Sequence, residues 1–180
     1  MFNKMKNIFI IAFTIFFGMI SAQVAIGKTT LSSPSVSLEF GTANRGIILP
    51  WVTSAASVTG AVNGTMIYDL TDKKVKIKFA SLWKDLSVDA AGTTIDPLTS
   101  IDGTLIQNTV IENTNAKMAI GPLTSTPGIL VLEASDKAMV LPKVASPHLN
   151  IINPSPGMMV YDTVNKQLAV FNGKVWTFWK

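Results

Sequence analysis

The sequence predicts a mainly β protein with little helix, built as two tandem antiparallel β-meander repeats that follow a signal peptide. Short runs alternate apolar and polar residues and are separated by Gly, Pro, Asn and Asp, which is typical of strands and turns. A set of anchor residues recurs at offsets of 92 to 94 positions, which indicates an internal duplication. The 180 residues include no cysteine, so disulfides cannot stabilise the fold.

The first 22 residues have the layout of a secretory signal peptide. Lys4 and Lys6 precede an apolar run at 8–20, and the small residues Ser21 and Ala22 follow it. The run is shorter than the ~20 apolar residues that span a bilayer, so we expect export and no membrane span after cleavage. An uncleaved anchor is the alternative.

The rest of the chain divides into a first repeat at 23–86, a linker or spacer at 87–116 and a second repeat at 117–180. Four pairs of residues anchor the two repeats in the same order: Pro50 and Pro142, Tyr68 and Tyr161, Asp69 and Asp162, Trp83 and Trp176. What recurs is a framework of glycine, proline and core residues. Because units of about 65 residues are marginal alone, we expect the repeats to pack on each other or on other subunits.

In the first repeat, strands are expected at 36–40 and 46–50, the second ending at its proline because proline cannot donate to a ladder. Residues 53–63 form a short helix or a loop. Strands at 66–69 and 74–79 flank a turn at 69–73, and the three lysines of the latter strand should lie on an exposed face and protect an edge. The counterpart of the first strand, 129–133, is more uniformly apolar, which suits a strand covered on both faces.

The second repeat contains the strongest hairpin signal, Asn172-Gly173, between strands at 167–171 and 174–178. Three prolines before residue 157 disfavour a long helix there. In the linker, one strand-like run is expected at 104–106.

Charge and reactive residues favour a non-enzymatic protein. After removal of Lys4 and Lys6, 13 basic and 11 acidic residues remain, and this net charge of +2 does not suggest nucleic-acid binding. His148 is the only histidine, without a cysteine or second histidine for a metal site. Asp69 and Asp72 suit a turn better than catalysis, because the second repeat has Asn165 in place of Asp72. We therefore expect no catalytic residue, no cofactor and no metal.

Tryptophans that differ between the repeats are the candidate ligand contacts. Trp83, Trp176, Tyr68 and Tyr161 pair between repeats and are expected to be buried. Trp51 and Trp179 have no counterpart, and Lys143 stands where Trp51 would repeat. An exposed contact with a glycan is therefore expected first at Trp51 or Trp179, among the positions where the halves differ, which also include Lys143 and His148.

Two longer motifs resemble known exported proteins. Residues 24–30 followed by Leu38-Glu39 resemble a "VGIGT…LDV" segment of phage tail-fibre-like and secreted bacterial surface proteins. Residues 157–163 and 171–176 are similar to the "GxMIYNT…YNGxxW" pattern of exported Bacteroidetes (flavobacterial) proteins. The family's arginine after the prolines is Val52 in one copy and Val144 in the other. The resemblance implies export and a fibre- or surface-type role, and it implies no catalytic residues.

The sequence thus predicts an exported structural or adhesive surface protein that is fibre-like and self-associates, with a trimer as one form. The alternative is a secreted glycan- or ligand-binding module, and a surface glycan or a protein is the expected partner in either case. Asp162-Thr163-Val164 also resembles an O-glycosylation sequon, although a turn explains the same residues.

Overall fold

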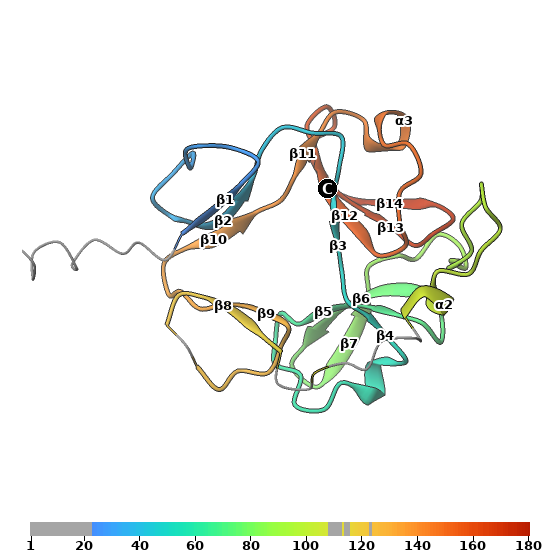
Figure 1. The fold of residues 1–180 in the computed structure, drawn as a ribbon, viewed down its shortest axis with the longest axis horizontal. Coiled ribbons are helices and arrows are strands. Elements are labelled where there is room, and N and C mark those ends of the chain that lie inside the picture. The colour runs from blue at the N-terminus through green and yellow to red at the C-terminus, as the bar shows by residue number, and fades with distance from the viewer. Residues whose placement is uncertain (1–22, 108–112, 114–115, 123) are drawn as a thin grey trace, which may run out of the picture.

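The computed structural model describes residues 23–107, 113, 116–122 and 124–180, and the expected signal peptide at 1–22 lies outside them (Figure 1). The fold is mainly β, as predicted. Its helical elements are single turns: η1 (Ala55–Ser57), α2 (Thr104–Gln107) and α3 (Pro147–Asn150). In the part of the chain that is described, no helix is long and apolar enough to cross a membrane.

Two sheets share one strand order, and each ends in an antiparallel meander. In the first sheet the order is β4-β5-β6-β7, and in the second it is β11-β12-β13-β14. The strands of the first are β4 (Trp51–Val52), β5 (Met66–Asp69), β6 (Lys74–Phe79) and β7 (Leu82–Asp85). Those of the second are β11 (Lys143–Val144), β12 (Met158–Asp162), β13 (Gln167–Phe171) and β14 (Trp176–Trp179).

Pairing registers in the two sheets correspond residue by residue. Tyr68 lies opposite Val75 in the first sheet, and Tyr161 lies opposite Leu168 in the second, so both partners are displaced by 93 positions. The same displacement relates the pair Lys78 and Trp83 to the pair Phe171 and Trp176. The 93-residue spacing of the tyrosine, aspartate and tryptophan anchors is therefore also the spacing of the antiparallel pairings.

Parallel pairs, which the sequence did not predict, complete the architecture. β1 (Val24–Ile26) runs parallel to β2 (Val36–Phe40), and β8 (Met118–Ile120) runs parallel to β9 (Leu130–Leu132). β4 and β11 begin directly after the two anchor prolines and run parallel to β5 and β12. Their ladders explain the proline–tyrosine anchors: the Tyr68 N–H donates to the Pro50 carbonyl and the Tyr161 N–H to the Pro142 carbonyl, each at 2.9 Å.

Two short strands cross between the halves of the chain. β10 (Ala138–Val140) adds parallel to β2 and completes a three-stranded sheet with β1. β3 (Ile47–Ile48) adds antiparallel to the start of β12. Each ends before its Leu-Pro pair, so β3 stops short of the end predicted at Pro50, and in Figure 1 the chain passes from β3 beside β12 to β4 of the first sheet. The halves are therefore interleaved and do not form two separate beads.

The buried core also joins the two halves of the chain. One cluster of buried side chains draws from both halves and contains Leu49, Tyr68, Val75, Leu86, Met159 and Val170. A second cluster lies within the second sheet and contains Val144, Ile151, Met158, Val160, Ala169 and Phe171. Burial across the halves supplies stability that a cysteine-free chain cannot obtain from disulfides.

Two local predictions are wrong. The run at 104–106 belongs to α2, because the Asp102 side chain accepts the Thr104 N–H at 3.0 Å and its carbonyl accepts the Leu105 N–H, which starts a turn. The lysines of β6 do not protect an edge, because β5 and β7 pair with β6 on both sides. Only 13% of the Lys76 side chain is exposed.

The predicted hairpin at Asn172-Gly173 is confirmed, with a four-residue loop between Phe171 and Trp176. Gly173 has φ of +94°, and a Cβ there would lie 1.8 Å from the Thr93 carbonyl oxygen. Only glycine fits this close contact between the hairpin and the linker.

Lys73 and Lys166 hold the left-handed conformation at the same place in the turns before β6 and β13, with φ of 58° and 54°. A non-glycine residue pays a steric cost there that glycine avoids. We expect Lys166→Gly to raise the free energy of unfolding by about 0.5–1 kcal/mol, measured by urea denaturation. The matched control is Lys174→Gly in the neighbouring exposed loop, where φ is not positive. Equal effects at the two lysines would contradict this explanation.

Candidate functional site

Both tryptophans predicted as ligand contacts are half-buried at the boundary between the two sheets. The Trp51 indole N–H donates to the Pro156 carbonyl at 2.8 Å, and the Trp179 indole N–H donates to the Leu86 carbonyl at 2.7 Å. The Lys84 ammonium lies 5.0 Å from the centre of the Trp179 ring. Each tryptophan therefore connects its own half to the other, and ligand contact by either one stays a prediction.

Tyr68 and Asn172 form the most buried polar connection of this boundary, and neither side chain is exposed to solvent. The Tyr68 hydroxyl donates to the Asn172 carbonyl at 2.9 Å. Burial, with the nearby Asp72 carboxylate as the smaller cause, raises the pKa of the Tyr68 phenol above its usual range, so this group stays a neutral donor. The Asn172 amide donates to the Ala90 carbonyl at 2.7 Å, which holds the linker against both sheets.

The remaining anchors take structural positions. Tyr161, Trp83 and Trp176 are half-buried. Trp176 packs at a tilt against Phe171, with ring centres 5.2 Å apart, and the Lys78 ammonium lies 5.5 Å from the Trp83 ring.

Lys143 and His148, which differ between the halves, are both exposed. The His148 and Phe178 rings pack in a T-shaped arrangement with their centres 5.8 Å apart. Among the described residues, no group of three or more His, Cys, Asp or Glu could hold a metal ion.

A cleft of about 740 Å³ lies beside Trp51. Its walls come from β3 and the following Leu-Pro pair, from the linker, from the residue before β9 and from the loop before β12, and they include Ile48, Pro50, Ile101, Ile129 and Pro156. The volume lies within the range of small-molecule sites, and the cleft brings Trp51 next to apolar side chains. Trp179 does not line this cleft.

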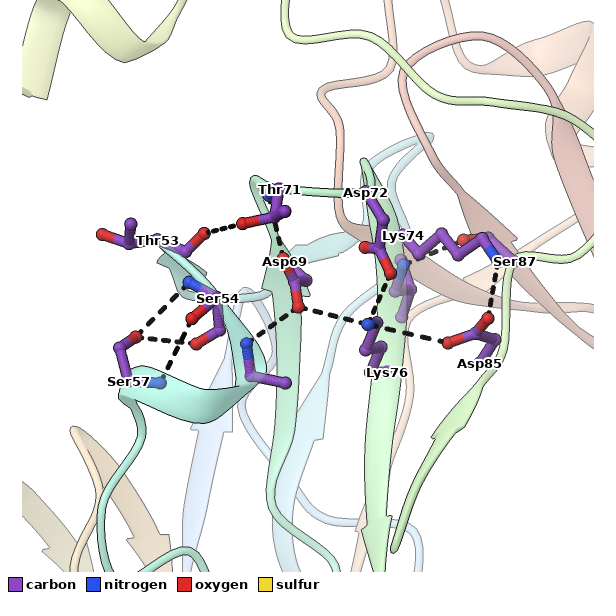
Figure 2. Close-up of polar contacts among 12 residues, drawn as sticks. Thr53, Ser54, Ser57, Asp69, Thr71, Asp72, Lys74, Lys76, Asp85 and Ser87 are labelled. Atoms are coloured by element: carbon purple, nitrogen blue, oxygen red, sulfur yellow. Dashed lines mark hydrogen bonds and ion pairs between the residues drawn. The ribbon is translucent and has the colours of Figure 1, made fainter.

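Asp69 holds the turn of the first sheet, as predicted for a capping aspartate. Its carboxylate accepts the backbone N–H groups of Ala55 at 2.8 Å and Thr71 at 2.9 Å. Figure 2 shows the Lys76 ammonium directed at three carboxylates, with distances of 3.2 Å to Asp69, 2.5 Å to Asp72 and 3.9 Å to Asp85. Sequence reasoning missed this network because its members come from three neighbouring strands and the turn between two of them.

The pKa shifts of this network follow from its contacts. Burial lowers the pKa of Lys76, but hydrogen bonds to Asp72 and Asp69 outweigh it and raise the pKa. Burial raises the pKa of Asp69, but the two backbone N–H groups and Lys76 outweigh it and lower the pKa. Asp69 and Lys76 therefore both stay charged near neutral pH and form an ion pair.

Asp162 repeats this role in the second sheet without a lysine. It is fully buried, and it accepts the N–H groups of Ser146 at 3.1 Å and Val164 at 3.0 Å and the Asn165 amide at 3.0 Å. Burial raises its pKa, but these hydrogen bonds, the Asn165 side chain first, outweigh burial and lower the pKa to about 2. The predicted turn role of this aspartate is confirmed.

The low pKa of Asp162 makes its contribution to stability depend on pH. A depressed carboxyl pKa stabilises the fold above the unfolded value of about 4, and the contribution disappears as pH falls through about 2. We expect Asp162→Asn to lower the melting temperature near neutral pH, and the difference from wild type to shrink between about pH 4 and pH 2. Thermal melts of both proteins across this range measure it. A difference that does not change with pH would contradict it.

An open apolar strand edge lies at β9. Among the described residues β9 pairs only with β8, and no strand pairs with its other edge. Ile129 is 56% exposed, Leu130 46% and Met118 63%. The sequence suggested cover on both faces for the run 129–133, and the single chain leaves its first two residues exposed and the rest half-buried. An unpaired apolar edge is a template for a strand from another chain.

Comparison with known proteins matches residues 119–180 to the family model described as the phage tail like trimerisation region. No curated protein and no solved structure matches. The matched segment contains β9, β10 and the whole second sheet. A trimerisation region has a structural task, and the match supports self-association. The C-terminal third of the chain is therefore similar to a phage tail-like trimerisation region and supports a fibre-like, assembly-related protein.

Proposed function

We propose that this protein is an exported structural protein that assembles as a trimer on a surface or in a fibre. The match of residues 119–180 to a trimerisation region carries the proposal. The open edge at β9 supports it, because exposed apolar strand residues favour self-association.

The chain is, in this proposal, a tandem duplication of one module. The equal strand orders and the constant displacement of 93 positions between paired residues support the duplication. Trimer contacts of the matched second half would then have equivalents in the first half.

Export is supported by the basic and apolar segments of residues 1–22, and a surface or adhesive role is the one that suits an exported trimer. Mass spectrometry of the protein recovered outside the producing cells tests it. An N-terminus at Gln23 is expected, and protein retained inside with Met1 would contradict export.

Sedimentation equilibrium of residues 23–180 at micromolar concentration tests assembly. The expected mass is three times that of the chain. A stable monomer throughout the concentration series would overturn the proposal.

A second candidate function is ligand binding in the cleft beside Trp51, because an indole at an apolar cleft suits stacking on a sugar ring. Tryptophan fluorescence titrated with a panel of polysaccharides tests it. Trp51→Phe should abolish the response, and Trp83→Phe is the matched control outside the cleft. A response that persists in Trp51→Phe would assign binding elsewhere.

A further inference from the structure

The two strands that cross between the halves stand at equivalent places in them. β3 precedes Leu49-Pro50 and β10 precedes Leu141-Pro142, at an offset of 92 positions. β10 docks parallel on β2, and β3 docks antiparallel on β12. β2 and β12 therefore each offer an edge on which the strand before a Leu-Pro pair docks.

The two dockings use opposite edges of that strand. The Leu49 N–H donates to the Gly157 carbonyl at 3.1 Å, whereas the Ala138 N–H donates to the Ser35 carbonyl at 2.9 Å. With the offset of 92, Ala138 corresponds to Gly46, three positions before Leu49. Because successive N–H groups of a strand point to alternate edges, an odd separation places these two on opposite edges. A strand that precedes a Leu-Pro pair can hence pair on one edge with β2 or its equivalent and on the other edge with β12 or its equivalent.

The equivalent of the β2 edge is empty. The Gly41 N–H donates to Ile26 in the first half, as the Glu133 N–H donates to Ile120 in the second, so β9 takes the place of β2 and Leu130 that of Leu38. β2 carries β10 on its outer edge. Within the described ranges, the outer edge of β9 carries no strand.

The equivalent of the β12 edge is also empty. Thr65 and Met66 correspond to Met158 and the following residue, on which β3 docks. A Cβ on Gly64 would meet nothing within 4 Å, whereas one on the equivalent Gly157 would lie 3.0 Å from Tyr68. Gly64 thus stands in open space, and among the described residues no strand pairs with Thr65 and Met66 on the edge equivalent to the one that β3 fills.

We propose that a second copy of the chain fills both edges, with β3 of one chain lying parallel on β9 of another and a β10 strand lying antiparallel on Thr65 and Met66. The register copies the pairs within the chain. Met139 lies opposite Leu38, so Ile47 of one chain lies opposite Leu130 of the next. The inference rests on the proposed trimer and names the strands that form it.

A three-fold ring follows from this geometry. Each unit passes a strand to one neighbour and receives a strand from the other, which is a head-to-tail contact that closes when the rotation fits. The two halves of each chain occupy two successive positions, because β10 docks on β2 and β3 docks on β12 within the chain. Three chains then supply six successive positions, which close into one ring with three-fold symmetry.

Cysteine pairing tests this register, because the chain has no cysteine of its own. Ile47→Cys and Leu130→Cys are made in separate copies of residues 23–180 that carry tags of different size, and the two proteins are refolded together. Neighbouring residues on paired strands lie within the Cα separation that a disulfide needs. After mild oxidation, a non-reducing gel should show the mixed disulfide at about tenfold the level given by a control pair. The control is Ile47→Cys with Val164→Cys, whose native side chain is 59% exposed.

Each outcome separates this inference from the proposed function. A trimer in sedimentation without the Ile47–Leu130 disulfide overturns the strand register and leaves the trimer standing. A trimer in which Ile47→Cys pairs with Leu38→Cys of another chain does the same, since like halves would then meet. A monomeric mass overturns both. Circular dichroism of each single variant, expected to match wild type, shows that the folds compared are the same.

Discussion

Replacing Asn172 with alanine should lower the free energy of unfolding by about 3 kcal/mol. The side chain is fully buried, and its amide donates to the Ala90 carbonyl at 2.7 Å. Its oxygen accepts the N–H groups of Lys174 at 3.0 Å and Val175 at 2.9 Å. Alanine leaves all three partners without this hydrogen bond, two of them at the half-buried residues Ala90 and Val175, so the loss exceeds that of an ordinary exposed contact. Urea denaturation followed by tryptophan fluorescence measures it.

The matched control is Asn63→Ala, because Asn63 is exposed and precedes a turn glycine in the same way. We expect a change within about 0.5 kcal/mol there. Equal losses for Asn63→Ala and Asn172→Ala would show that the boundary between the halves does not depend on this side chain.

Met159→Ala should cost about 2–4 kcal/mol, because it opens a cavity in the cluster that both halves share. Met159 is 2% exposed and packs in one cluster with Tyr68 and Val75 of the first half. Since one cluster serves both halves, we expect calorimetry to show a single transition that moves to lower temperature.

Leu149→Ala is the control for Met159→Ala, because Leu149 has a similar volume and is 72% exposed. Its melting temperature should stay close to that of wild type. Two separate transitions in Met159→Ala, one for each half, would contradict a shared core.

Local signals explain which parts of the fold the sequence predicted. The strand at 74–79 follows a period-two pattern, the other meander strands are short apolar runs bounded by turn residues, and Asn172-Gly173 marks a hairpin within a few residues of its strands. Asp69 and Asp162 were predicted as turn residues because an aspartate caps the N–H groups next to it in sequence. Each of these features depends on neighbours along the chain.

Long-range pairing explains what the sequence did not predict. β3, β4 and β11 have two residues each, too few to show a period. The partners of β3 and β10 lie about a hundred residues away, and no local pattern names them. The same applies to the candidate site: Trp51 and Trp179 stood out because they have no counterpart, but their hydrogen bonds to the opposite half depend on how the sheets meet. The apolar run before Glu133 did indicate a further contact. It suggested a strand covered on both faces, and one chain does not cover both.

The crossing of β3 and β10 also sets the order in which this protein can fold. β2 can pair with β10 only after about a hundred more residues have been synthesised, and β3 likewise pairs only after β12 has been synthesised. A ribosome that has released only the first half has therefore released no finished sheet with β2 or β3 in it. Distant pairing slows folding. The strands β2 and β3 can therefore stay unpaired through most of synthesis, and an unfolded segment is the state in which a general export channel accepts a polypeptide.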